Sequence, residues 1–328
     1  MEQKALIVSE ELVRKYLTPE DAIDIVEKTW RWYSEGQVVM PNKITTDMSS
    51  LGVDGWFNSM PAYIGPMKTA GIKLVGGYGK NKSIGLPYIK ATVVLMDPET
   101  GILRAVISGD TVSDLRTGAQ PAIMTKLLAA KTDVVTLIGT GTQAYASLLC
   151  MSKVLDMKEV RLCDISEEAK TRFAARFPDA PWKFVNCKSN EEGCRSADVI
   201  ITITNANADL VEEPWVKEGA LVMTMGSFRE VSFDVVRKAD KIAVDQIGQS
   251  LHRGNLKELA EMGEITAESF DIIIPDVLAG KMQARTNPKD RIYAQIIGTG
   301  MLDVALAAHA LEKILAAGET VPAIDMEK

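Results

Sequence analysis

The segment that begins at Val134 constrains the fold of this chain more than any other. The apolar run Val134–Ile138 reads as a strand, Gly139-Thr140-Gly141-Thr142-Gln143-Ala144 follows it, and a helix is expected to continue to about residue 155. A glycine turn between strand and helix lets the backbone approach a pyrophosphate, which free N–H groups of the helix then bind. The turn is a shortened GxGxxG fingerprint with Ala144 in third place, and alone it is a weak signal. We assign four of its residues to a dinucleotide: Gly139, Gly141, Thr142 and Gln143.

An acidic residue stands where such a site needs one. The next strand, Glu159–Cys163, runs into Asp164. A carboxylate at this place accepts hydrogen bonds from the adenosine ribose and repels a 2′-phosphate, which favours NAD(H) over NADP(H). The alternative is that Asp164-Ile165-Ser166 only caps a helix, and one residue can also do both.

Strands and helices alternate through the middle of the chain. From Val134 onward the apolar runs are separated by helical segments, and their composition suits a parallel sheet covered on both faces. After the first two strands, the runs are Asp198–Ile203, Ala220–Met225 and Lys241–Val244. We therefore predict an α/β fold class with a Rossmann-type NAD-binding domain over residues 121–298.

The flanking segments follow a different pattern. Thr18-Pro19 predicts the start of a helix over 18–35, and Gly36 its end. Short β-like runs at Gly55–Asn58, Gly71–Val75 and Ala91–Met96 follow, and the turn signal Asp97–Gly101 predicts a link between antiparallel strands. Helices are expected at Ala122–Ala130 and Met301–Ala317. Residues 1–120 with 299–328 are therefore expected to form a second, α+β domain.

Composition excludes several classes of function. A net charge of -7 argues against a nucleic-acid binder. The sequence contains no uncharged apolar stretch of about 18 residues, so a membrane span is not expected. Four scattered cysteines and two histidines do not suit a zinc site or a disulfide scaffold. The charged N-terminus lacks the pattern of a secretory signal, so a cytoplasmic protein without a metal is expected.

Several segments, taken together, resemble the ornithine cyclodeaminase/μ-crystallin family, which also includes amino-acid dehydrogenases and ketimine reductases. The order and spacing of these segments agree with the family from about residue 1 to residue 315. They are Met40-Pro41-Asn42-Lys43, Ser59-Met60-Pro61-Ala62-Tyr63, Gly71-Ile72-Lys73-Leu74-Val75, Leu115-Arg116-Thr117-Gly118-Ala119 and the glycine turn. The resemblance implies a homodimer whose substrate-binding and dimerisation domain combines the N-terminal part with the last helix.

The resemblance also implies a substrate pocket with three cations. Lys73 matches the family's pocket lysine beside the reacting carbon, where an ammonium group could bind a carboxylate or stabilise charge as an imine is reduced. Arg116 matches an arginine whose planar fork suits a substrate carboxylate, and Lys43 a further cation near that group. The alternatives are a lysine at a strand edge for Lys73, a structural ion pair for Arg116, and a surface lysine for Lys43.

Two positions depart from the family. Asn58 stands where cyclodeaminases have a glutamate and a dehydrogenase branch an arginine, and Phe228 stands where an aspartate is expected. A phenyl ring accepts no proton, so ornithine cyclisation is disfavoured. Three nearby residues could compensate: Glu230, Arg229 and Asp234. The loop Gly76–Asn81 also departs from the family, and it either shapes a different pocket or is simply flexible.

These features predict hydride transfer between a nicotinamide and the carbon of a small amino or imino acid. Asn58 would help select the side chain. Thr204 and Ser227 are expected on the nicotinamide side, and Met225 is also expected to bind the cofactor. One alternative is a cyclodeaminase-like lyase that recycles bound NAD+, and another is a μ-crystallin-like protein that binds NAD or a small ligand without turnover.

Overall fold

The computed structural model describes residues 4–326, apart from the side chain of Lys82. Its contacts divide the chain into two compact units: unit 1 is Met1–Arg116 with Thr299–Lys328, and unit 2 is Thr117–Gly298. The first boundary lies inside α3 (Asp110–Leu128), as does the boundary predicted after residue 120. The outermost residues of the predicted first domain, 1–3 and 327–328, lie outside the described residues.

Unit 1 is a mixed sheet with helices. Its strands follow the order β16-β1-β7-β6-β5-β4-β2, and β3 also pairs with β4. The strands are β1 (Lys4–Val8), β2 (Val38–Val39), β3 (Ile44–Asp47), β4 (Gly55–Ile64), β5 (Thr69–Tyr78), β6 (Ile89–Met96), β7 (Leu103–Ser108) and β16 (Ala323–Asp325). The helices are α1 (Glu10–Tyr16), α2 (Pro19–Ser34), the start of α3 and α11 (Gly300–Ala316).

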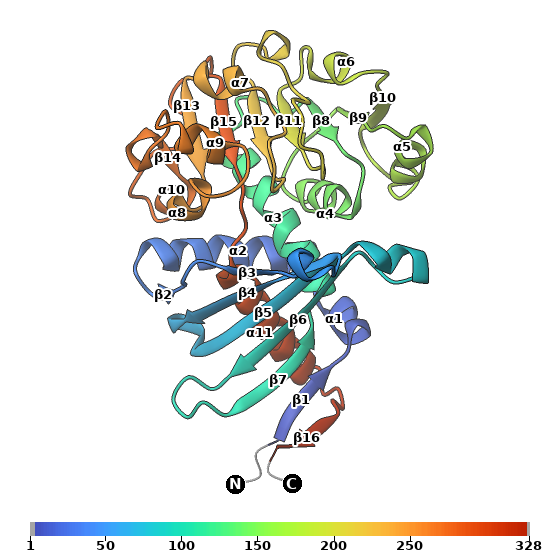
Figure 1. Cartoon of the computed structure of the whole chain (residues 1–328), viewed down its shortest axis with the longest axis vertical. Coiled ribbons are helices and arrows are strands. Elements are labelled where there is room, and N and C mark those ends of the chain that lie inside the picture. The colour runs from blue at the N-terminus through green and yellow to red at the C-terminus, as the bar shows by residue number, and fades with distance from the viewer. Residues whose placement is uncertain (1–3, 327–328) are drawn as a thin grey trace. The chain divides into compact units, whose positions relative to one another are not determined.

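The long helix α11 covers one face of this sheet. It packs against β4, β5 and β6, and α1 and α2 contact it as well (Figure 1). Because neighbours surround α11, most of its residues are buried, which explains its nearly continuous apolar sequence. Gly300 permits the close approach, since a Cβ there would lie 2.7 Å from the carbonyl oxygen of Met60.

Helix α2 begins as the sequence predicts. Thr18 and Asp21 form a capping box: the Thr18 side chain accepts from the Asp21 amide, and the Asp21 carboxylate accepts from the Thr18 amide. Asp21 also binds α11, because its Oδ2 lies 2.6 Å from Lys313 Nζ and its Oδ1 lies 3.2 Å from His309 Nε2. One carboxylate therefore caps a helix and joins two helices of unit 1.

Unit 2 is built on a parallel sheet in the order β10-β9-β8-β11-β12-β15-β13-β14. The strands are β8 (Val134–Ile138), β9 (Glu159–Cys163), β10 (Lys183–Asn186), β11 (Val199–Thr202), β12 (Leu221–Thr224), β13 (Lys241–Val244), β14 (Ile272–Ile273) and β15 (Ile292–Gln295). The helices after α3 are α4 (Thr142–Met151), α5 (Glu167–Ala174), α6 (Asn190–Cys194), α7 (Phe233–Arg237), α8 (Ile247–Ser250), α9 (Leu256–Glu261) and α10 (Ile274–Leu278). The order of the first five strands is that of a Rossmann fold, with the first strand at the centre and a reversal beside it.

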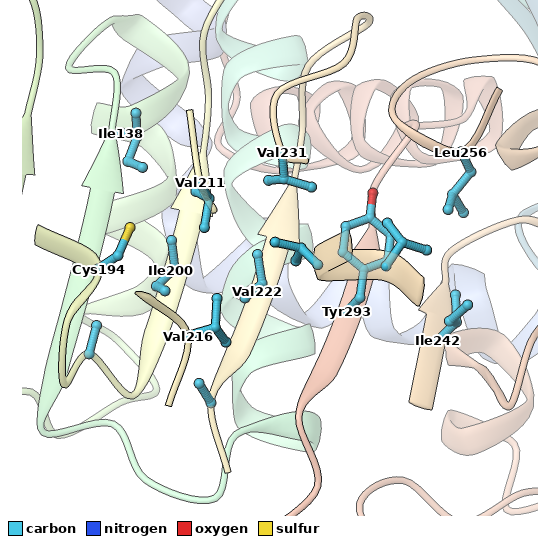
Figure 2. Packing of buried hydrophobic residues seen from close by; sticks show 14 of the residues in the cluster. Ile138, Cys194, Ile200, Val211, Val216, Val222, Val231, Ile242, Leu256 and Tyr293 are labelled. Atoms are coloured by element: carbon cyan, nitrogen blue, oxygen red, sulfur yellow. The ribbon is translucent and has the colours of Figure 1, made fainter. Parts of the chain in front are cut away.

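Buried side chains from neighbouring strands form a continuous apolar cluster in unit 2. Ile138, Ile200 and Val222 come from β8, β11 and β12, and Tyr293 from β15 (Figure 2). The phenol of Tyr293 is buried but partnered, since its Oη lies 2.7 Å from Thr224 Oγ1. Burial raises the pKa of this phenol above its ordinary value.

The structure extends several predicted elements. The helix expected at Ala122–Ala130 overlaps the end of α3, which begins at Asp110, includes Pro121 and ends at Leu128. Gly76 and Gly77 belong to β5, and the end of the predicted loop lies in a 3-10 helix over Gly79–Ile84. A Cβ on Gly77 would lie 2.8 Å from the Trp56 indole, so that glycine serves tight packing within the sheet.

The described residues include no helix long and apolar enough to cross a membrane, and no group of side chains arranged to hold a metal ion. All four cysteines are free thiols in the interior of unit 2, where Cys163 and Cys187 end β9 and follow β10.

The double role of Asp21 generates a stability prediction. We expect Asp21→Asn to lower the free energy of unfolding by about 1–2 kcal/mol, because it weakens a helix cap and removes the charge that pairs with Lys313. Asp24→Asn, on an exposed ion pair of the same helix, is the matched control and should change little. Thermal and urea unfolding measure both.

The pH dependence of this effect has a definite sign. Partial burial opposes ionisation, but the bonds from Lys313, Thr18 and His309 hold the pKa of Asp21 well below its ordinary value of 3.8. The stabilisation is therefore present above about pH 4 and is lost as the pH falls below it. An Asp21→Asn difference that is unchanged between pH 7 and pH 2.5 would contradict this account.

Candidate active site

The predicted dinucleotide residues lie at one edge of the sheet in unit 2. β8 pairs with β11 and β11 with β12, all in parallel, and these strands end at Ile138, Thr202 and Thr224. Their following loops therefore share the carboxyl edge, beside the point where the strand order reverses between β9 and β11. Open α/β sheets bind ligands at this place. The structure thus brings together the glycine turn, Thr204 and the segment from Met225 to Ser227.

The backbone of the turn fits a dinucleotide. Gly139 has φ +97°, and a Cβ on it would lie 2.5 Å from the carbonyl oxygen of Ile203, so glycine is required for both reasons. Gly141 is the N-cap of α4, and a Cβ there would meet open space. Thr142 and Gln143 form the first turn of α4, where backbone N–H groups have no partner within the helix. These groups could hold the pyrophosphate of NAD(H).

Asp164 organises the glycine turn through hydrogen bonds to its neighbours. Its Oδ2 accepts from the amide and the hydroxyl of Thr140 at 2.9 and 2.8 Å, and its Oδ1 accepts from the Ser166 amide at 3.1 Å. Burial works against the charged form, but these hydrogen bonds keep the pKa of Asp164 below its ordinary value. Asp164 is therefore an anion, as both predicted roles require.

Glu230 holds two of the loops at this edge. Its Oε1 accepts from the amide and the hydroxyl of Thr204, both at 2.7 Å, and its Oε2 accepts from Thr202 Oγ1 at 3.0 Å and from the Gly226 amide at 2.8 Å. The side chain is fully buried. Burial raises the pKa of Glu230, while the four donors oppose that shift. Both oxygens are occupied within unit 2, so Glu230 is a structural clamp and does not replace the aspartate absent at Phe228.

The other two suggested substitutes also have partners in unit 2. Arg229 pairs with Asp209 at 2.8 Å and with Glu258, and Asp234 pairs with Arg237 and Lys238. Phe228 is 52% exposed, and Ser227 beside it is also exposed. Met225 receives a weak contact from the Ser147 hydroxyl at 3.9 Å.

In unit 1, two of the predicted cations meet at one carboxylate. Lys73 projects from β5 on the face that α11 covers, and its Nζ lies 2.7 Å from Asp303 Oδ1. Arg116, from α3, places its Nε 2.9 Å from the same oxygen. Lys73 also donates to Ser113 Oγ at 3.3 Å. The structure therefore does not support the reading of Lys73 as a solvated lysine at a strand edge.

Burial changes the chemistry of Lys73. Desolvation and the charge of Arg116 lower its pKa from 10.5 to about 8, and the opposing attraction of Asp303 keeps the pKa from falling further. An amine with a pKa near neutrality can donate and accept a proton at ordinary pH.

Asn58 shares a sheet face with Lys73. In the β4–β5 register Met60 is opposite Lys73 and Asn58 is opposite Val75, so alternation directs both Asn58 and Lys73 to the covered face. Asn58 is buried, and its Oδ1 accepts from Thr45 Oγ1 at 2.6 Å. Lys43 lies two residues before Thr45, partly exposed, ahead of β3.

Sequence reasoning did not identify Asp303, Ser113 or Thr140. The signal for Asp303 was present, because it is an acid within the apolar first turns of a helix whose other charged residues lie near its end. A buried charge in such a place needs a partner. Thr140 and Ser113 left no comparable signal, since small hydroxyl residues occur in every kind of environment.

Comparison with known proteins agrees with this geometry. The family model described as "Ornithine cyclodeaminase/mu-crystallin family" matches residues 3–318. The chain is 32% identical to an alanine dehydrogenase of Archaeoglobus fulgidus over 317 residues, covering 95% of this chain and 96% of that protein. It is 30% identical to the ketimine reductase mu-crystallin of Mus musculus, covering 70% and 79%.

The fold is also similar to that of a solved structure. A solved archaeal alanine dehydrogenase dimer with bound NAD superposes with a TM-score of 0.92 and 31% sequence identity, covering 98% of this chain and 99% of that one. The chain therefore belongs to the ornithine cyclodeaminase/mu-crystallin family.

Proposed function

We propose that this protein is an NAD(H)-dependent oxidoreductase that interconverts a small amino acid and its imino or 2-oxo acid. The observation that carries the proposal is the buried Lys73, whose pKa of about 8 suits proton transfer, beside Arg116. Such a pair can bind a carboxylate and serve the nitrogen next to it. The similarity to an alanine dehydrogenase and to a ketimine reductase supports the same reaction class.

In this mechanism the residues of the chain bind, orient and exchange a proton. The guanidinium of Arg116, assisted by Lys43, holds the substrate carboxylate. An ammonium group has three N–H donors, and Lys73 uses two of them on Asp303 and Ser113 among the described residues, which leaves one for the substrate nitrogen. Bound NAD(H) supplies or accepts the hydride.

The cofactor would lie along the carboxyl edge of the sheet in unit 2. The glycine turn and the start of α4 would hold the pyrophosphate, and Asp164 the adenosine ribose. Thr204, Met225 and Ser227 would line the nicotinamide side. Glu230 would fix two of these loops, since it binds both Thr204 and Gly226.

The substrate side chain would be small and uncharged. Asn58 carries no charge, and it is buried and partnered by Thr45, so an ammonium group of a diamino acid would gain no ion pair there. Phe228 likewise offers no acceptor. Both residues disfavour ornithine or lysine as the substrate of a lyase.

We also propose a homodimer formed through the sheet face of unit 1 opposite α11. Side chains alternate on β4, β5 and β6, and the outward ones include apolar residues that are at least one-third exposed. Tyr63 and Met96 are both opposite Ala70 in the register, and Ile44 and Leu74 are both opposite Ser59. Exposed apolar faces of this kind mark interfaces, and the archaeal relative is described as a dimer.

The primary test is NADH consumption at 340 nm with a panel of 2-oxo acids with ammonia or amines, together with cyclic imines. We expect turnover that falls at least about 100-fold in Lys73→Met and in Arg116→Ala, because proton transfer and carboxylate binding are lost. NADH affinity should change little. Lys28→Met, on the exposed face of α2, is the matched control.

Three outcomes would overturn the proposal. Undiminished turnover in Lys73→Met would remove that residue from the chemistry. Ammonia release from ornithine or lysine without net NADH change would favour the lyase, and tight NADH binding with no turnover at all would favour a binding protein.

Cofactor choice provides a second prediction. Asp164→Asn keeps an acceptor for Thr140 but removes the charge that repels a 2′-phosphate. We expect the ratio of NADPH to NADH dissociation constants to fall about tenfold, equivalent to about 1.4 kcal/mol. Titration by quenching of intrinsic fluorescence measures it. Asp133→Asn, which precedes β8 at the opposite edge of the sheet, should leave the ratio unchanged; equal ratios in all three proteins would contradict the role of Asp164.

The dimer is tested by placing like charges on the exposed face. The double variant Tyr63→Glu with Met96→Glu should sediment as a monomer. A two-fold interface places the same surface of both subunits together, so the new carboxylates of one subunit would face those of the other and repel them. Met262→Glu replaces a similarly exposed apolar residue of unit 2 and should not change the sedimentation coefficient. A wild-type protein that is monomeric at micromolar concentration would refute the interface.

A further inference from the structure

Asp303 occupies an unusual electrostatic position. Its carboxylate is fully buried, and a single oxygen, Oδ1, binds both Lys73 and Arg116. The other oxygen, Oδ2, has no hydrogen-bond partner among the described residues. Burying a charge is costly unless groups of opposite charge meet it, and Oδ1 contacts two such groups. The carboxylate therefore acts on Lys73 through a direct contact.

The largest electrostatic influences on Lys73 come from two helices. Asp303 faces it from α11, and Arg116 and Asp114 act on it from α3. Its cross-strand neighbours, Met60 on β4 and Val93 on β6, are apolar. Asp303 is the acid in hydrogen-bond contact with the ammonium group, whereas Asp114 contributes the weaker attraction.

We propose that Asp303 is a positioning residue that keeps Lys73 in its ammonium form at neutral pH and directs it toward the substrate nitrogen. This inference rests on the proposed function. In the reductive direction, bound NADH would supply a hydride to the imine carbon, and the C=N π electrons would move onto nitrogen. That nitrogen takes a proton from Lys73 Nζ, which regains one from solvent. In the oxidative direction neutral Lys73 accepts the proton instead.

The physical argument is a balance of two shifts. Burial and Arg116 lower the pKa of Lys73 to about 8, and Asp303 opposes both. Without the carboxylate, burial and the repulsion from Arg116 would be opposed only by the weaker attraction of Asp114. Loss of an opposite charge at this distance shifts a pKa by about 1–3 units. Lys73 would then be largely a neutral amine at pH 7 and could not protonate an imine.

The first test measures Lys73 directly in the ligand-free protein. NMR of protein labelled with ¹³C at the lysine ε-carbon gives a titration curve for each lysine, and the Lys73 signal is the one absent from Lys73→Arg. We expect a midpoint near pH 8 in the wild type and one at least 1 unit lower in Asp303→Asn, whose amide keeps the shape of the side chain. Asp114→Asn is the matched control and should shift the midpoint less. An unchanged midpoint in folded Asp303→Asn overturns the proposal, whatever the protein's activity.

The second test is the pH profile of reductive turnover. In Asp303→Asn the alkaline limb should move to lower pH with the NMR midpoint, so that kcat falls about tenfold at pH 7 and recovers toward pH 5.5. A purely structural role would lower kcat by the same factor at every pH, and that result overturns the proposal. Asp303→Glu retains the charge and should restore the alkaline limb even though its longer side chain misplaces Lys73. Absence of turnover in the wild type would count against the proposed function and leave the NMR result as the test of Asp303.

Discussion

The contact of Lys73 and Arg116 with Asp303 is the constraint on which unit 1 depends. It joins β5, α3 and α11, which are elements from both ends of that unit's sequence. Removing one member would leave a buried charge without its partner, and this destabilises a protein more than replacing the whole ion pair with apolar side chains does. A chain that needed only stability would have an apolar group here. Buried ions therefore indicate that this part of the core is adapted to chemistry.

Elements that depend on local interactions could be predicted from the sequence, whereas elements that depend on long-range contacts could not. The helix at Thr18-Pro19 and the strand before Gly139 were predictable because capping and periodicity are local. The length of β5 was underestimated because Gly76 and Gly77 look like a loop until the Trp56 indole packs against Gly77. The strand β15 was missed because its pairing between β12 and β13 is a long-range property.

The candidate site divides in the same way. The edge that we propose for the dinucleotide follows from one turn and one acid, because backbone groups make most of the contacts in sites of this kind. The cations could be named only through family resemblance, and neither source identified Asp303, whose role depends on a contact between residues 230 positions apart. Glu230 shows the opposite error: a carboxylate suggested for catalysis is instead occupied by four donors from its own unit.

The two carboxylates illustrate how one kind of side chain takes different roles according to its partners. Both oxygens of Glu230 accept hydrogen bonds from neutral donors, and these bonds hold the loops that carry the donors in place. Asp303 contacts two cations through one oxygen, so its negative charge raises the pKa of Lys73. The first arrangement gives rigidity to the edge where a cofactor would lie. The second gives an amine a pKa near neutrality, as a reaction that must move a proton in either direction requires.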